Sequence, residues 1–165
     1  MTAYDVGLLI LRLVLGLTMA AHGYHKVFGG GRISGTARWF DSIGMRPGKL
    51  HATVAAASEI SAGLGLAAGL LTPIPAAGFV CLMLVAAWTV HRSHGFFIVE
   101  EGWEYNAVLG VGAVVVAMLG AGRLSIDWLI FGRNWCDGWA GLLFSVLLGL
   151  GGALGQLSLF YRPPA

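Results

Sequence analysis

Five long apolar stretches run through this chain of 165 residues and decide what it can fold into. A helix needs about 20 mostly apolar residues to cross a bilayer, and lipid offers an open backbone no hydrogen-bond partner. The sequence therefore predicts an all-α integral membrane bundle with five transmembrane helices. These helices are expected at residues 6–25, 50–71, 74–91, 105–122 and 139–160.

The composition supports this assignment and excludes several other classes of protein. Hydrophobic residues make up 57% of the chain and charged residues 11%, which is far from the balance of a soluble domain. A net charge of +2 is too small for a nucleic-acid-binding surface. The two cysteines lack a CxxC spacing, which excludes a disulfide scaffold, a cysteine zinc site and a thioredoxin-type pair. Any redox chemistry must therefore come from a bound cofactor or a partner protein.

The connections between the helices predict the orientation of the chain. Thr72-Pro73 is short enough to make a tight antiparallel hairpin, and proline suits the opening of the next helix. Five crossings then place residues 26–49, residues 92–104 and the C-terminus on one side, which holds seven Lys and Arg against two on the other. The positive-inside rule puts this side, with its basic 26–49 loop, in the cytoplasm of a multi-pass plasma-membrane protein. Reporter fusions at Gly30 and Asn134 test this orientation.

Residues 34–44 in the first loop show the pattern of a short interfacial helix. Trp39, Phe40 and Ile43 are expected to face lipid, and Arg38 and Asp41 to face water. An irregular loop held by its basic residues is the alternative.

Two small-residue motifs, Gly65xxxGly69 and Gly151xxxGly155, allow another backbone to approach a helix closely. Packing inside the bundle is the favoured use. Pairing between two chains is the other, so a homo-oligomer is left open.

Two charged residues fall inside the apolar stretches. A charge near the centre of a bilayer costs about 2.5 to 3.5 kcal/mol on insertion scales, so Arg12 and Glu59 need a partner. Their depths allow the long arginine side chain to reach the carboxylate, and we expect them to pair. The pair could lock two helices together or could bind a polar ligand. Alternatively, Arg12 would extend toward the nearer interface.

All five histidines fall at helix ends on the side predicted to be cytoplasmic, together with a lysine. Interfacial anchoring, a metal or haem site, an anion site and a proton relay beside a quinone all use such residues. No cysteine or paired carboxylate accompanies them, so we predict no metal site. Glu104, at the mouth of the fourth helix, could reach this group. Its members are His22, His25, Lys26, His51, His91 and His94.

Several short motifs in order give the chain a recognisable pattern. The first two helices carry Arg12xxxGly16xxxxxHis22-Gly23xxLys26 and Glu59xxxGly63xxxxxGly69. His94-Gly-Phe-Phe97, Glu104-Tyr105-Asn106 and Gly120-Ala-Gly-Arg-Leu-Ser-Ile-Asp127 follow. Over residues 6–130, the chain resembles the DoxX family, which is similar to the small membrane subunit of thiosulfate:quinone oxidoreductase.

The resemblance implies a four-helix membrane domain at residues 1–130, followed at residues 131–165 by a linker and an additional transmembrane helix that departs from the family pattern. It implies no intrinsic cofactor and a possible quinone ligand. No residue is assigned a catalytic role. The ligand-binding residues that it points to are Arg12, His22, Lys26, Glu59, His94 and Glu104, with Asp127 also in the pattern.

Two functions from different classes follow from these features. The first is the membrane subunit of a quinone-linked oxidoreductase acting on a sulfur oxoanion or related donor, with a soluble or membrane redox protein as partner. The second is a non-enzymatic membrane adaptor that assembles soluble redox or sulfur-handling enzymes. Transport through the bundle is disfavoured because no inverted repeat is evident. Whether the chain is an enzyme at all stays open.

Overall fold

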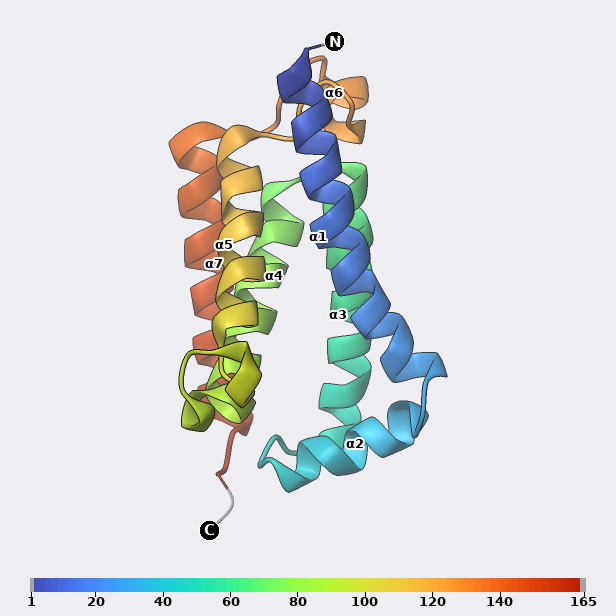
Figure 1. Cartoon of the computed structure of the whole chain (residues 1–165), viewed down its shortest axis with the longest axis vertical. Coiled ribbons are helices and arrows are strands. Elements are labelled where there is room, and N and C mark those ends of the chain that lie inside the picture. Colours follow the sequence, from blue (N-terminus) through green and yellow to red (C-terminus); the bar gives the residue numbers. More distant parts are fainter. Residues whose placement is uncertain (1, 164–165) are drawn as a thin grey trace.

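The computed structural model describes residues 2–163, and within them the chain is an all-α membrane helical bundle without a β-strand (Figure 1). The fourth helix continues as a π-helical turn at Ala87–His91 and a 3-10 turn at Arg92–His94, and a further 3-10 turn spans Ile98–Glu100. The α-helices are α1 (Ala3–Phe28), α2 (Arg32–Ser42), α3 (Gly48–Ala68), α4 (Pro73–Ala86), α5 (Glu104–Leu119), α6 (Ile126–Phe131) and α7 (Gly138–Phe160).

The five expected helices are present as α1, α3, α4, α5 and α7, which confirms the predicted all-α architecture with its additional C-terminal helix. Within residues 2–163, three helices are long and apolar enough to cross a membrane: Ala3–Phe28, Pro73–His94 and Gly138–Phe160. Helix α5 is apolar but has only 16 residues. Helix α3 is long enough at 21 residues, but it carries Glu59 and packs against α1, α2 and α4.

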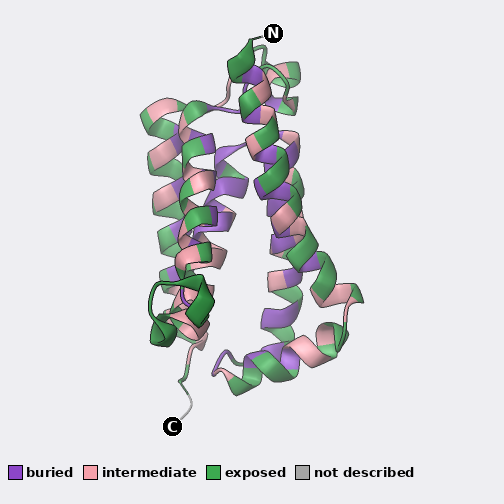
Figure 2. Cartoon of the chain, in the orientation of Figure 1, coloured by how far each residue is buried: buried purple, intermediate pink, exposed green. Residues whose placement is uncertain are grey.

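The helices form two groups that meet between α3 and α4. Helix α1 packs along α3, whereas α4, α5 and α7 pack against one another. Helix α2 lies across the lower end of the bundle in Figure 1, and α6 lies at the upper end near the N-terminus. Buried residues face the inside of this assembly and exposed residues cover its outside (Figure 2). Polar side chains buried between the helices are therefore shielded from lipid.

Local sequence signals set the helix ends. Thr2 and Asp5 form a capping box at the start of α1, with Thr2 N donating to Asp5 Oδ2 at 2.8 Å. Helix α3 stops at Gly69, whose φ of 65° is left-handed, and Pro73 is the first residue of α4. The tight hairpin predicted at residues 72 and 73 is confirmed.

Backbone contact at glycines holds α1 against α3. A Cβ on Gly16 would lie against the carbonyl oxygen of Gly63, and one on Gly23 would lie against that of Ala56. Any larger side chain at these positions would force the two helices apart. The close approach also brings the last turns of α1 beside the middle of α3, where Glu59 lies.

The first loop forms α2, which confirms the predicted helix in place of an irregular loop. Trp39 is 44% exposed, as an interfacial residue would be, but the prediction that Phe40 faces lipid is wrong. Phe40 is buried in a cluster with Met45 and Val85. The reason is that α2 packs on α3, so its apolar face covers the end of the bundle.

Helix α7 is packed into the bundle along α4 and α5. Beyond its C-terminal end, the chain returns to the segment that precedes α3: Arg162 N donates to Gly44 O at 2.8 Å, and Met45 and Tyr161 form an isolated β-bridge. Gly151 and Gly155 have open space where a Cβ would lie, so the second small-residue motif is not used for packing inside the chain.

Candidate functional site

The buried charges lie in two separate places. Arg12 reaches the α3–α4 hairpin, where its guanidinium lies against Gly69. Gly69 is ten residues beyond Glu59, which is about 15 Å along the axis of α3 at 1.5 Å per residue. The predicted pairing of Arg12 with Glu59 is therefore wrong. Arg12 extends toward the nearer end of the bundle, the alternative that its sequence position also allowed.

Protein groups replace water around only part of Arg12: its Nη2 has a hydrogen-bond partner, whereas its buried Nε and Nη1 have none among the described residues. The side chain is fully buried, and its Nη2 donates to the backbone oxygen of Leu124 at 2.5 Å. Asp127, also fully buried, is linked to the same place, because its backbone N donates to the oxygen of Gly69 at 2.9 Å and the guanidinium lies against Gly69. The Asp127 carboxylate accepts from Leu71 N at 2.6 Å and from Thr72 N and Oγ1 at 3.0 and 2.8 Å. This arrangement ties the segment before α6 to α1, and the first turn of α6 to the α3–α4 hairpin.

Glu59 pairs instead with Lys26, from the last turn of α1. Lys26 Nζ lies 2.8 Å from Glu59 Oε1 and 2.7 Å from Oε2, and the two side chains are 21% and 10% exposed. Gly23 makes this geometry possible, because a Cβ there would meet the Cβ of Glu59. His22 lies on the same helix, four residues before Lys26. One end of the bundle therefore holds a shielded ion pair with a histidine nearby.

The ion pair lies in the wall of a cavity of about 220 Å³. Every helix around it contributes: α1 gives Lys26, α2 gives Trp39 and Phe40, and α7 gives Gln156. The remaining residues come from α3 and from α4 with its π-helical turn. Most of the lining is apolar, and the polar side chains beside the ion pair are Ser58, Thr89 and Gln156, with the thiol of Cys81.

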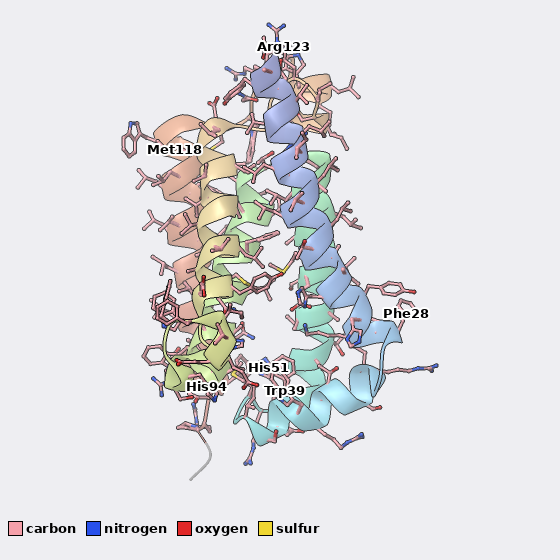
Figure 3. All side chains as sticks on the ribbon, viewed as in Figure 1. Phe28, Trp39, His51, His94, Met118 and Arg123 are labelled. Carbon is pink, nitrogen blue, oxygen red and sulfur yellow. The ribbon has the colours of Figure 1, made fainter. Side chains whose placement is uncertain are left out.

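His51 and His94 both lie at the lower end of the bundle in Figure 3, but the histidines have different neighbours. His22 Nε2 lies 3.4 Å from the Tyr105 hydroxyl, and His91 Nδ1 lies 2.6 Å from the backbone oxygen of Glu101. His94 is exposed. The structure therefore supports their common location, but not a single cluster.

Two other predicted site residues have local roles away from the cavity. The Glu104 carboxylate accepts a hydrogen bond from Ile98 N at 2.9 Å, which holds the loop that precedes α5. Asp127 belongs with Arg12 at the opposite end of the bundle. Within residues 2–163, no three His, Cys, Asp or Glu side chains converge in a way that could hold a metal ion.

Sequence reasoning missed Gln156 as a member of the site. Its Nε2 lies 3.2 Å from Nδ1 of His51, which is buried at the start of α3. A glutamine four residues before the end of an apolar spanning helix was the available signal, because polar side chains within such helices usually face the bundle interior.

The chain is similar to several bacterial proteins over most of its length. A Bacillus subtilis protein named "Putative oxidoreductase CatD" is 29% identical over 78% of this chain and 90% of its own. The Escherichia coli "Inner membrane protein YqjF" is 26% identical over 79% of this chain and 96% of its own. A Haemophilus influenzae protein named "Uncharacterized protein" is 29% identical over 76% of this chain and 83% of its own.

No solved structure matches the chain. The family model that does match it is that of DoxX. The match covers residues 7–92, which contain most of α1, the ion pair and most of the cavity wall. The chain thus belongs to the DoxX family.

Proposed function

We propose that this chain is the membrane subunit of a quinone-linked oxidoreductase and that the cavity beside Lys26 and Glu59 receives the quinone ring. The observation that carries the proposal is a shielded ion pair in the wall of a mostly apolar cavity within a membrane bundle. Ionisable groups at such positions usually serve binding or proton transfer. The name of the Bacillus subtilis relative, which includes "oxidoreductase", points the same way.

The cavity suits one substituted six-membered ring. A cavity of about 150 Å³ in another protein holds benzene, so 220 Å³ leaves room for ring oxygens and small substituents. Aromatic side chains from α2 would contact the face or edge of a ring, and α4 supplies aliphatic groups. A long isoprenoid tail does not fit in this volume and would have to extend into the surrounding lipid.

Lys26 and Glu59 offer complementary chemistry to ring oxygens. An ammonium group has three N–H donors, and two of those on Lys26 are used by the Glu59 oxygens, which leaves one for a carbonyl of the ligand. Glu59, once protonated, could donate to the same oxygen. A bound quinone would take up two electrons and two protons as its carbonyls become hydroxyls. The electrons would come from a sulfur oxoanion or related donor that loses them on a partner redox protein.

The binding test uses protein purified in mild detergent and a short-chain benzoquinone as the probe. We expect the unaltered protein to bind it and Lys26→Met to bind it at least tenfold more weakly. Lys49→Met is the matched control, because Lys49 is an exposed lysine at the start of α3. Absence of binding by the unaltered protein, or equal losses in the two variants, contradicts the proposal.

The adaptor function remains the second candidate, and the exposed basic side chains of α2 favour it. Arg32 and Arg38 point away from the bundle at the end that carries the basic loop, on the side we place in the cytoplasm. The two functions differ in a reaction assay of thiosulfate-dependent quinone reduction, run with and without co-purified partners. Activity that is lost in Lys26→Met supports the oxidoreductase. No activity with every partner present, together with partner binding that is lost in Arg32→Ser, Arg38→Ser, supports the adaptor.

A further inference from the structure

A second hollow lies where α4, α5 and α7 meet. It is a groove of about 380 Å³, and its wall is apolar apart from one carboxamide and the indole N–H of one tryptophan. Helix α4 turns a different face to each hollow: the groove is lined by Val80, Met83 and Leu84, and the cavity beside the ion pair by Cys81, Leu82 and Val85. At about 100° per residue, these two sets lie on opposite sides of the helix. The groove is therefore separate from the cavity and shares no wall residue with it.

The groove is long and narrow. Along α5 its wall runs from Trp103, which precedes the helix, to Val114, which is about 16 Å at 1.5 Å per residue. The volume spread over that length leaves a width of about 5 Å, where non-bonded carbon atoms pack at about 3.5 to 4.0 Å. Leu84, Val111 and Leu150 in its wall are exposed apolar side chains on the outside of the bundle. The groove thus opens toward lipid and admits one extended hydrocarbon chain, whereas a helix, about 10 Å across, does not fit.

The carboxamide in the wall belongs to Asn106, in the first turn of α5. The residue is 6% exposed, and the one hydrogen-bond contact of its side chain within residues 2–163 is a weak one to the sulfur of Met83, at 3.7 Å. Met83 also lines the groove, so this contact lies in the groove wall. A carboxamide has two N–H groups, and a single contact leaves at least one of them without a partner whichever way the amide is turned. Hydrocarbon offers that N–H no acceptor, so an occupant with an acceptor oxygen is favoured.

Trp103 marks the depth of this amide in the membrane. Its side chain is 40% exposed and lies edge-on to Phe96, with 4.8 Å between the ring centroids. Tryptophan rings favour the headgroup level of a bilayer, and Asn106 lies three residues further along, about 4.5 Å deeper. In a glycerolipid, the ester carbonyls come directly below the headgroup, where each acyl chain begins. An N–H at this depth, with a narrow apolar groove leading inward from it, matches the two parts of one acyl ester.

We propose that the groove binds one acyl chain of a membrane phospholipid and that the Asn106 amide donates a hydrogen bond to the ester carbonyl of that chain. This site is independent of the proposed quinone cavity, because the two hollows have no wall residue in common. Gly110 keeps the groove open. A Cβ at that position would lie 3.7 Å from the Cβ of Met83, which is ordinary contact, so a larger side chain there fills the groove without forcing α4 and α5 apart.

The experiment titrates the whole protein, purified in mild detergent, with two phosphatidylcholines and counts bound lipids by native mass spectrometry. The two lipids have chains of equal length, joined by esters in the diacyl lipid and by ethers, which lack the carbonyl, in the dialkyl lipid. We expect the unaltered protein to bind the diacyl lipid about fivefold more tightly, the worth of one net hydrogen bond. Asn106→Leu keeps the size of the side chain and removes the amide, so it should bind the two lipids equally. Val108→Leu, at an exposed position of α5 outside the groove wall, is the control and should keep the preference.

A second variant tests the place of the site without altering the amide. Gly110→Leu should weaken binding of both lipids at least tenfold, because its side chain occupies the groove. Unchanged binding in this variant, or equal affinity of the unaltered protein for the two lipids, overturns the proposal. A lipid-free dimer that becomes monomeric in Asn106→Leu also overturns it, since a second copy of the chain then covers the groove. The comparison of ester with ether lipids in the unaltered protein decides the matter even if Asn106→Leu does not fold.

Discussion

The ion pair between Lys26 and Glu59 predicts an unequal response to removal of its two partners. Lys26→Met leaves the Glu59 carboxyl 11 residues inside α3 with both of its hydrogen bonds lost. Breaking a buried ion pair from one side costs about 3 to 5 kcal/mol, and the partial exposure of both side chains places this case near about 3 kcal/mol.

The opposite substitution should cost less. Glu59→Gln leaves Lys26 without a countercharge, but Lys26 is two residues from the end of α1, and its long side chain can turn toward water. We expect a cost of about 1 kcal/mol, close to that of one lost hydrogen bond. The double variant should cost no more than Lys26→Met alone, because the neutral amide that replaces the Glu59 carboxylate no longer strands a charge in the bundle.

The assay is equilibrium unfolding in mixed micelles by titration with a denaturing detergent, followed by helical circular dichroism. Lys49→Met, at an exposed position, should change the free energy of unfolding by less than about 0.5 kcal/mol. A larger cost for Glu59→Gln than for Lys26→Met, or costs that simply add in the double variant, would refute a shielded and coupled pair.

Two further predictions concern the other end of the bundle and the crossing of α1 with α3. Arg12→Met should speed amide hydrogen exchange in residues 120–127 by about tenfold or more, because Arg12 anchors that segment at Leu124 O. Ligand binding in the cavity should stay unchanged. Loss of ligand binding without faster exchange would contradict the separation of the Arg12 site from the cavity. Gly16→Leu should destabilise the protein by about 2 kcal/mol or more in the same unfolding assay, because its side chain meets the backbone of Gly63. Gly7→Leu, where a Cβ meets nothing within 4 Å, should be nearly neutral, and equal effects at the two glycines would show that α1 and α3 do not cross as described.

The parts of the fold that depend on apolar length could be predicted from the sequence. The five helices and the hairpin at Pro73 follow from hydrophobic runs and from the geometry of proline. The orientation of Phe40 could not, because a short amphipathic pattern shows that one face is apolar but does not say whether lipid or protein covers it.

The candidate site was predicted only in part, because the position of a residue along its helix does not show which groups from other segments it meets. Arg12 and Glu59 were both recognised as charges that need partners, but helix position alone cannot show that the chain before α6 folds back against α1 and supplies the oxygen of Leu124. Lys26 lies near a helix end, where a lysine ordinarily turns to water, so its inward reach to Glu59 depends on Gly23 and on the close crossing of two helices. Gln156 could be placed at the cavity only from the packing of α7 on α4, which the sequence does not show.

The return of the chain from the end of α7 to Gly44 and Met45 has a consequence for biosynthesis. Translation must reach the end of α7 before the side of the cavity that includes Gln156 exists. Until then, Glu59 can pair with Lys26, but the cavity lacks the side that α7 supplies. In this intermediate the unfinished cavity is open to the insertion machinery and to lipid.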